Sequence, residues 1–356
     1  MSESISYVLP LRWTTPGPID ELAGYLRAIS PEVREILVVD GSPTPVYEMH
    51  AEALDGIARH LPPHPDLDFA MGKANGVVTG VRECRHEYVV LADDDVRYDS
   101  AALRRLASLL DTAELVRPQN HFDELPWHAR WDTARTLLNR VFTGDPVFPV
   151  GDFPGTLAVR RSAFLASDAY DGDSLFENLE LMRTIHAAGG RVVSPLDLYV
   201  ARRPPSAAHF LSQRVRQAYD DFAIPLRMGA FLAIPPLAGR LLWRGRWPSV
   251  LAGACASMAV AELGRRRAGG AERFPLSGSL LAPVWIAERS LCSWLALAAK
   301  ARGGVRYGEG RVTQSATPVR RLRHRSRRGS RSPCASHRRT VASGSDRSDR
   351  ARPPAG

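Results

Sequence analysis

The chain of 356 residues has few cysteines and no internal repeat. The cysteines are Cys84, Cys255, Cys292 and Cys334. They form no CxxC pair and share no regular spacing, which excludes a cysteine-ligated zinc site and a disulfide scaffold. The absence of a fixed period argues against a solenoid. Because the first thirteen residues lack a basic region followed by an apolar one, we expect the chain to work in a reducing, cytosolic setting.

Acidic residues are scarce near the C-terminus, and their scarcity accounts for the net charge of +9. Residues 313–356 contain twelve Arg and two Asp and carry a net +10, so the rest of the chain carries −1. A protein that reads nucleic acid presents basic residues on a folded face, whereas this stretch has too little apolar surface to order itself. We therefore expect a disordered Arg/Ser-rich tail and no specific nucleic-acid partner. A basic nucleic-acid-binding protein stays an alternative.

The first half of the chain alternates β-rich runs with helical patterns, which is typical of an α/β fold with a parallel sheet covered by helices. The predicted strands are Ile5–Leu11, Glu35–Val39, Leu67–Ala70 and Tyr88–Ala92, and the predicted helices are Ile19–Ile29, Lys73–Arg85 and Ser100–Leu110. Each predicted strand ends in a polar or glycine-rich turn. In an open α/β sheet the ligand binds outside the carboxyl ends of the strands, so we expect a site at that edge.

From residue 223 the composition changes to Ala, Leu and Pro with few acids. The apolar blocks are Ala223–Trp243, Ser249–Leu263 and Leu280–Ala299. Charged residues interrupt or bracket two of them, and the second is shorter than the roughly 20 residues that a membrane span needs. Flanking arginines resemble cytoplasmic anchors, and Pro235-Pro236 suits a broken or re-entrant segment. We expect residues 223–312 to be a helical, membrane-associated region, with a buried helical subdomain as the alternative.

The sharpest functional pattern is an apolar strand that runs directly into Asp93-Asp94-Asp95. Three adjacent carboxylates are costly to bury unless a cation neutralises them. Mg²⁺ or Mn²⁺ takes oxygen ligands and leaves coordination positions open for diphosphate oxygens. The predicted metal ligands are Asp95 and Asp93, and Asp93 and Asp94 are predicted to lie near a phosphorylated donor. An acidic turn that caps the helix near Ser100 is the structural alternative.

The order of three motifs resembles the family 2 glycosyltransferases of the GT-A fold. The motifs are Val38-Val39-Asp40-Gly41-Ser42 at a strand end, Gly72-Lys73-Ala74-Asn75-Gly76, and the strand that ends in three aspartates. The resemblance extends over residues 6–219. It implies a Rossmann-like, mostly parallel sheet in residues 1–222, in which Pro10, Asp40 and Lys73 contact a nucleotide-sugar donor.

A later acidic motif bears on the catalytic base. Family members usually carry Glu-Asp at this point, and the Asp is the general base in inverting members. Here the pair is Glu177-Asn178, and an asparagine cannot take a proton, so the predicted base is Glu177 or Asp173. Ser174 and Glu177 also fit a capping box, which is the structural alternative.

A helical motif near the end of the resemblance points to a membrane subclass. Gln213 and Arg216 match the QxxRW motif of processive and lipid-glycosylating members, with Gln217 in place of Trp. The resemblance implies that both contact the donor diphosphate or the acceptor, and it is nearest to ceramide glucosyltransferase-like, membrane-associated members. A solvated arginine on a helix face is the alternative.

The sequence therefore predicts a metal-dependent enzyme that moves a sugar, with inversion, from a nucleotide-sugar donor to a hydroxyl of a lipid or glycan. A UDP-sugar is the favoured donor, and the catalytic domain is expected at the cell membrane, facing the cytoplasm. A sugar-nucleotide pyrophosphorylase is one alternative, although Pro10-Leu11-Arg12-Trp13-Thr14 is not the glycine-rich phosphate loop that it would need. A non-catalytic membrane scaffold is the other.

Overall fold

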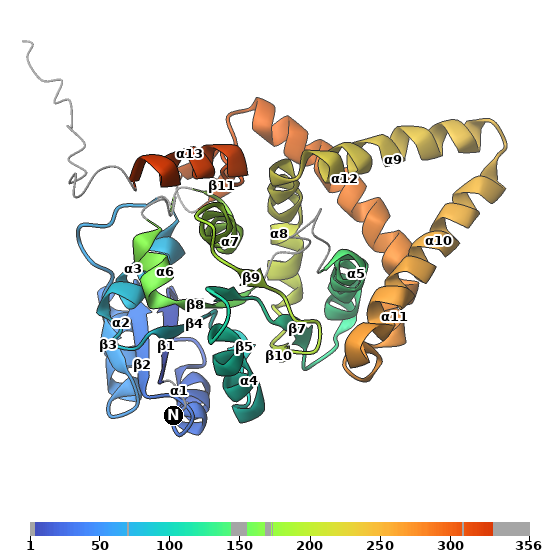
Figure 1. Ribbon diagram of the computed structural model, residues 1–356. Helices are drawn as coiled ribbons and strands as arrows, with labels where there is room; N and C mark the ends of the chain where they lie inside the picture. The colour runs from blue at the N-terminus through green and yellow to red at the C-terminus, as the bar shows by residue number, and fades with distance from the viewer. Residues whose placement is uncertain are drawn as a thin grey trace, which may run out of the picture.

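The computed structural model describes residues 4–69, 71–143, 155–167, 172, 174–307 and 310–329. A seven-stranded sheet in the order β3-β2-β1-β4-β8-β6-β9 forms the centre of the N-terminal part (Figure 1). Its strands are β1 (Ile5–Leu11), β2 (Glu35–Asp40), β3 (Arg59–Leu61), β4 (Tyr88–Ala92), β6 (Leu115–Val116), β8 (Thr156–Arg160) and β9 (Val192–Val193). Every pairing is parallel except those of β8 with β4 and β6, which confirms the predicted mostly parallel sheet.

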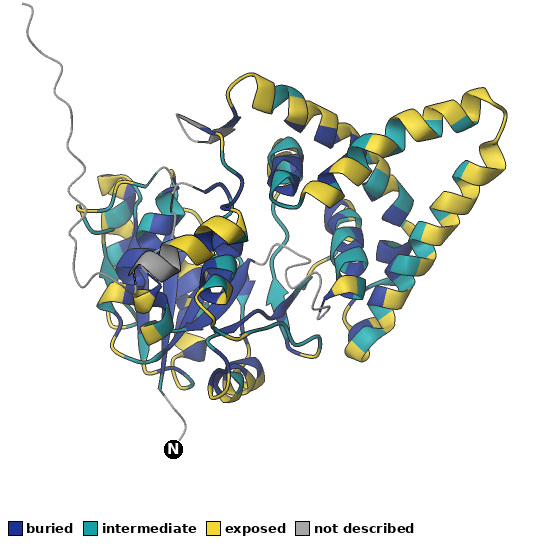
Figure 2. Ribbon diagram, turned by 45° about the horizontal axis from the view of Figure 1, so that its top comes forward, coloured by how far each residue is buried: buried dark blue, intermediate teal, exposed yellow. Residues whose placement is uncertain are grey.

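Helices cover both faces of this sheet, because side chains of the central strands alternate between two cores. Tyr7 and Leu9 of β1 pack toward α1 (Ile19–Ile29) and α4 (Ser100–Leu110). Val8 packs on the opposite face, toward α3 (Gly72–Glu83), α6 (Arg161–Ala166) and α7 (Glu177–Ala187). The dark blue strands in Figure 2 are correspondingly buried. Helix α2 (Thr44–Leu54) follows β2.

Two glycines bring α3 unusually close to β1. A Cβ atom at Gly80 would lie 2.2 Å from Cγ1 of Val8, and one at Gly76 would lie 2.8 Å from Cβ of Pro10. Real Cβ atoms do not approach that closely, so only glycine fits at either position. The close contact fixes the first turn of α3, with Lys73, beside the carboxyl end of β1.

One predicted strand is wrong. Residues 67–69 form no strand, Ala70 lies outside the described residues, and β3 is instead the third parallel strand, paired with β2. The backbone N–H of Phe69 donates to Oδ1 of Asn75 at 3.0 Å, so a side chain of α3 takes the place of a sheet partner. The other predicted strands and helices of the first half are confirmed, with ends that differ by two residues at most.

Two smaller sheets flank the main one. The first has the order β5-β10-β7 and consists of β5 (Val96–Arg97), β7 (Gln119–Phe122) and β10 (Tyr199–Arg202). The second pairs β11 (Val305–Tyr307) with β12 (Gly310–Val312). Strand β5 follows the turn after β4 immediately, so the smaller sheet with β10 stands beside the three aspartates.

A group of helices forms the other side of the molecule (Figure 1). They are α5 (Trp127–Phe142), α8 (Ala207–Tyr219), η1 (Asp220–Ala223), α9 (Pro225–Trp243), α10 (Trp247–Arg266), η2 (Arg267–Glu272), α11 (Leu276–Leu280) and α12 (Ala282–Ala301). Helix α9 continues through Pro235 and Pro236 and is not broken there, in contrast to the prediction. Helices α9 and α10 make a projecting hairpin whose outer surface is largely exposed (Figure 2). Among the described residues, no helix combines the length and apolarity needed to cross a membrane.

A buried ion cluster joins this helical region to the rest of the chain. Arg214 of α8 donates to Oδ1 of Asp132 on α5 at 3.0 Å and pairs with Glu288 of α12 at 2.5 Å. All three side chains are largely shielded from solvent. Charges buried in this way need partners, so α5, α8 and α12 are held in one arrangement.

The start of the C-terminal segment is ordered. Thr317 donates its backbone N–H to Oε2 of Glu180 at 2.7 Å, and Leu175 donates to the carbonyl of Gln314 at 3.0 Å. Helix α13 (Val319–Gly329) follows. The structure thus differs from the expectation of a disordered tail from residue 313, because Gln314, Ser315 and Thr317 make hydrogen bonds to the segment around α7. Residues 330–356 lie outside the description.

Candidate functional site

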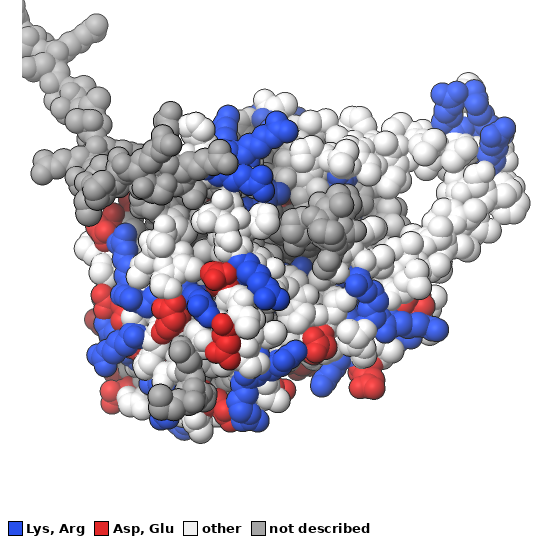
Figure 3. All heavy atoms as spheres, in the orientation of Figure 1, with Lys and Arg blue, Asp and Glu red and all other residues white. Residues whose placement is uncertain are grey.

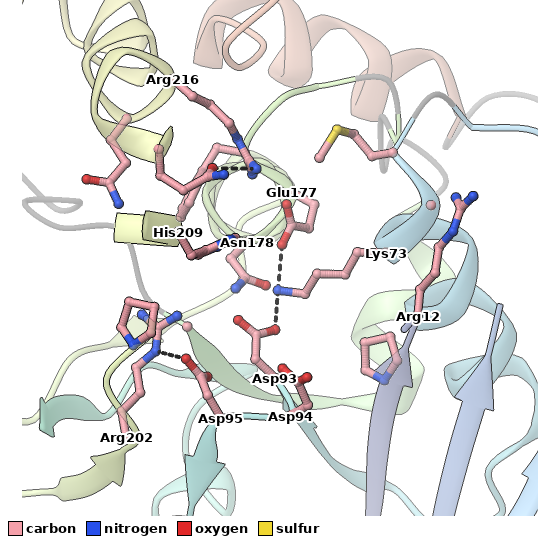
Figure 4. Close-up of a pocket in the computed structure, with 18 of the residues that line it drawn as sticks. Arg12, Lys73, Asp93, Asp94, Asp95, Glu177, Asn178, Arg202, His209 and Arg216 are labelled. Carbon is pink, nitrogen blue, oxygen red and sulfur yellow. Dashed lines mark hydrogen bonds and ion pairs between the residues drawn. The ribbon is translucent and has the colours of Figure 1, made fainter. Parts of the chain in front are cut away.

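A cavity of about 720 Å³ opens at the carboxyl ends of β1, β2 and β4. This is the edge at which a doubly wound sheet binds ligands, and the volume is typical of small-molecule sites. The predicted site residues that line it are Pro10, Lys73, Asp93, Asp94, Asp95, Glu177, Gln213 and Arg216. Figure 4 shows the charged members converging from several elements. Residues that are far apart in the sequence therefore meet in one hollow.

Among the predicted site residues that the structure describes, Asp40 is the one whose side chain does not line the cavity. Its neighbours Val39 and Gly41 line the cavity, but its own side chain is fully buried away from it. Oδ2 lies 2.7 Å from Nδ1 of His50 and 3.1 Å from Nε2 of His60, and Oδ1 accepts from the N–H of Ser42. These contacts lower the pKa of Asp40 to about 2, although burial alone would raise it. The structure thus differs from the prediction that this carboxylate contacts the donor.

Lys73 connects two carboxylates at the centre of the cavity. Its Nζ pairs with Oδ1 of Asp93 and lies 2.6 Å from Oε1 of Glu177 (Figure 4). Burial would lower the pKa of Lys73, but the two carboxylates raise it above its usual value. Burial would raise the pKa of Glu177, but Lys73 lowers it. Lys73 is therefore protonated and Glu177 is ionised at neutral pH.

Asp95 has one engaged oxygen and one that is unpaired. Nε of Arg202 lies 2.6 Å from Oδ2 of Asp95, whereas Oδ1 is buried and has no hydrogen-bond partner among the described residues. Asp94 accepts a hydrogen bond of 2.6 Å from Nε1 of Trp13. The three aspartates do not cap the next helix, because the N-cap of α4 is Asp99, whose side chain accepts from Ala102. The capping alternative is thus wrong, and one carboxylate oxygen of a cavity-lining residue is left without a partner among the described residues.

The carboxylates of the cavity can hold a divalent cation only together with a bound ligand that supplies further oxygen atoms. Within the described ranges, no three side chains of His, Cys, Asp or Glu are grouped as a metal site by themselves. Mg²⁺ is usually held by one or two carboxylates, with substrate phosphates and water completing the shell. Asp95, through its unpaired Oδ1, and Asp93 supply such a pair.

The structure describes only part of the acidic motif near residue 177. Glu177 and Asn178 line the cavity at the first turn of α7, and Asp173 lies outside the described residues. The capping-box alternative is wrong, since α7 begins at Glu177 itself and its N-cap, Phe176, makes no side-chain cap hydrogen bond.

The helix with the QxxR motif presents two of its side chains to the cavity. Gln213 and Arg216 both line it, and Arg216 donates to Oε1 of Gln213 at 3.0 Å. The intervening Arg214 points the other way, into the buried ion cluster. The alternative, in which the arginine lies on a solvated helix face, is therefore wrong.

Sequence reasoning missed several charged residues that line the cavity: Arg12, Arg202, Arg289 and Asp220. Arg12 directly follows Leu11, the last residue of β1. Its place at the edge of the sheet that lines the cavity could therefore have been predicted from the sequence. The doublet Asp220-Asp221 immediately after the QxxR helix was a visible but unused sign. Arg289 comes from α12, and nothing in the local sequence connects that helix to the aspartates.

No protein-family model matches the sequence, and no curated protein matches it. Among solved structures, one similar fold is a mannosyltransferase from Pyrobaculum calidifontis in complex with GDP-Man and Mn²⁺, with TM-score 0.45, 16% identity, and coverage of 83% of this chain and 88% of that one. Another is glucosyl-3-phosphoglycerate synthase from Mycobacterium tuberculosis with Mn²⁺, UDP and phosphoglyceric acid, with TM-score 0.42, 18% identity, and coverage of 58% and 73%. At TM-scores this low, the function has to be argued from the residues of this chain.

Proposed function

We propose that this chain is a glycosyltransferase that moves a sugar from a nucleotide-sugar donor, with a UDP-sugar favoured, to a hydroxyl group of a lipid or glycan. The observation that carries the proposal is the unpaired, buried Oδ1 of Asp95 in a cavity that also holds Lys73 and Asp93. A buried carboxylate oxygen without a partner is costly, and a cation shared with a diphosphate would satisfy it. The resemblance of the motifs to family 2 glycosyltransferases supports the same conclusion.

Positively charged side chains in the cavity support the proposed sugar transfer, because they can stabilise a leaving diphosphate. Lys73 and Arg202 are firm cations beside Asp93 and Asp95, and Arg216 extends the positive lining toward α8. Such groups stabilise the negative charge that develops on a departing nucleoside diphosphate. A divalent ion held by Asp93 and Asp95 would supply Lewis-acid stabilisation of the same charge. Attack by the acceptor hydroxyl from the opposite face then inverts the anomeric carbon.

We further propose that the enzyme works on the cytoplasmic face of the cell membrane and attaches to it through the α9–α10 hairpin. The tip of the hairpin carries Trp243 and Trp247, which are 88% and 62% exposed. Arg240, Arg244 and Arg246 lie at the same ends of α9 and α10, and Figure 3 shows a basic cluster at the far end of the hairpin. Tryptophan favours the membrane–water interface, and arginine is attracted to anionic headgroups. The occupant of this tip is thus an anionic lipid surface.

Turnover of candidate donors tests the proposal. Purified full-length protein is incubated with UDP-, GDP- and TDP-sugars, with Mn²⁺ or with EDTA, and release of the nucleoside diphosphate is measured. We expect metal-dependent release from at least one donor. Failure to turn over every donor in the presence of Mn²⁺ and Mg²⁺ would contradict the assignment, and release of pyrophosphate from a sugar phosphate and a nucleoside triphosphate would favour the pyrophosphorylase alternative.

A further inference from the structure

Asp220 is a cavity-lining carboxylate for which neither the ion pairs nor the metal site provides a role. It is the first residue of η1, directly after α8, and only 4% of it is exposed. Its Oδ1 is buried and has no hydrogen-bond partner among the described residues. A carboxylate kept in such a place is expensive for the fold, and strongly perturbed acids in a cleft are candidates for function.

The other carboxylates that line the cavity within the described residues are already engaged by donors. They are Asp93, Asp94, Asp95, Asp132 and Glu177, each of which pairs with a cation or accepts a hydrogen bond. A general base must have a lone pair free for the incoming proton, and the unpaired Oδ1 of Asp95 is already assigned to the proposed cation. Glu177 is poorly suited, because Lys73 binds it and lowers its pKa, which makes it a weak proton acceptor.

The charges around Asp220 suit a base that works near neutral pH. The groups that act on it are Arg216 of α8, Arg289 of α12, Asp221 of η1 and Glu177 of α7. Burial is the largest influence and raises the pKa of Asp220 to about 7, the two arginines lower it, and the two carboxylates raise it. A base is most effective when its pKa lies near the working pH.

We propose that Asp220 is the general base of the sugar transfer, a role that rests on the proposed function above. Its carboxylate accepts the proton of the acceptor hydroxyl while the hydroxyl oxygen forms a bond to the anomeric carbon. The bond from that carbon to the diphosphate oxygen breaks, and its electron pair leaves with the nucleoside diphosphate. Asp220 thereby takes the role of the aspartate that family members usually carry at the position where this chain has Asn178.

The pH dependence of donor hydrolysis by the full-length enzyme tests this role, because water is then the acceptor and needs the same base. For the wild type we expect kcat/KM to rise with pH through an inflection near 7. Asp220→Asn should lower turnover at least about 100-fold and remove the inflection. The affinity for UDP or GDP with Mn²⁺ should be unchanged, which shows that the variant is folded. Glu177→Gln should keep an inflection but move it to lower pH, because the charge of Glu177 raises the pKa of Asp220, and the exposed Asp66→Asn should behave as wild type.

Azide separates a base from a merely structural residue. Azide is a nucleophile that carries no proton to remove, so its attack on the anomeric carbon needs no base. Asp220→Asn should therefore form the glycosyl azide at a rate close to that of the wild type. If Asp220→Asn does not fold, Asp220→Glu provides the test, because it should retain the inflection at reduced turnover.

Three results would overturn the assignment of Asp220 alone, and two of them concern Asp220→Asn: wild-type turnover in the folded variant, or no azide reaction in it despite unchanged nucleotide affinity. A wild-type enzyme that turns over donor without an inflection near pH 7 would do the same. A wild-type enzyme that turns over no donor at all would instead overturn the proposed sugar transfer, and the role of Asp220 with it.

Discussion

Nε of Arg202 lies 2.6 Å from Oδ2 of Asp95, and this contact leaves Oδ1 of the same carboxylate buried and unpaired among the described residues. Arg202 ends β10, whereas Asp95 follows β4, so the contact depends on the smaller sheet that brings β10 beside β5. The guanidinium engages one oxygen of this cavity-lining carboxylate and leaves the other without a partner in the described part of the chain.

Replacement of Arg202 should weaken the site without altering its ligands. Residues that orient metal-binding carboxylates contribute about 10–100-fold to metal affinity or activity, so we expect Arg202→Met to lower metal-dependent turnover by that factor. Arg203→Met is the matched control, because Arg203 pairs with Glu21 away from the cavity. Equal turnover of the two variants would show that the contact between Arg202 and Asp95 has no role in the site.

Asp132 should stabilise the fold in a pH-dependent way. Burial would raise its pKa, but Arg135 and Arg214 lower it to about 2, against about 3.9 in an unfolded chain. Because the folded value is the lower one, the stabilisation is complete above about pH 4 and is lost as the pH falls toward 2. Asp132→Asn should thus lower the free energy of unfolding by roughly 2–3 kcal/mol at neutral pH.

Urea unfolding at several pH values measures this effect. The difference between wild type and Asp132→Asn should shrink as the pH drops below about 4. Asp66→Asn serves as the control, since Asp66 forms an exposed pair with Arg82 that contributes little. A difference for Asp132→Asn that is independent of pH would show that the ion cluster does not stabilise the contact of α5 with α8 and α12.

The close approach of α3 to β1 makes opposite predictions for two glycines. In Gly80→Ala the new Cβ would lie 2.2 Å from Cγ1 of Val8, so we expect a loss of about 1–3 kcal/mol in the free energy of unfolding. In Gly24→Ala, on α1, nothing lies within 4 Å, and the variant should gain about 0.5–1 kcal/mol. Thermal or chemical unfolding measures both, and a stabilising Gly80→Ala would contradict the packing described for α3.

The hairpin tip should bind anionic vesicles. We expect the wild type to sediment with phosphatidylglycerol vesicles, but not with phosphatidylcholine vesicles, and to be released as the salt concentration rises. The double variant Trp243→Ser, Trp247→Ser should lose most of this binding. Trp127→Ser is the control, because Trp127 is also exposed but lies on α5. Binding that is indifferent to lipid charge, or unchanged in the double variant, would argue against attachment through the tip.

The sequence was sufficient to predict three strands of the main sheet and the aspartates at its edge. The strands β1, β2 and β4 are runs of apolar residues that only a buried sheet can accommodate, and Asp93, Asp94 and Asp95 follow β4 with no intervening residue. Because carboxyl ends of parallel strands meet at one edge, their placement in a cavity with Lys73 follows from topology.

The orientations of single side chains could not be predicted in the same way. Asp40 also ends a strand, but His50 of α2 and His60 of β3 draw its carboxylate away from the cavity. Those partners are brought together only by the tertiary fold. The burial that raises the pKa of Asp220 likewise comes from surrounding elements, among them α12, whose Arg289 lies far along the chain. Local patterns contain no information about such long-range contacts.

The binding of a nucleoside diphosphate with and without metal tests the central claim most directly. Titration calorimetry of UDP and GDP with full-length wild type and with Asp95→Asn, each in Mn²⁺ and in EDTA, measures the contribution of the shared cation. We predict tight binding of one nucleotide by the wild type in Mn²⁺, weak binding in EDTA, and the same weak binding by Asp95→Asn in both conditions. Wild-type affinity that is independent of Mn²⁺, or that survives unchanged in Asp95→Asn, would contradict a cation held between Asp95 and a phosphorylated donor.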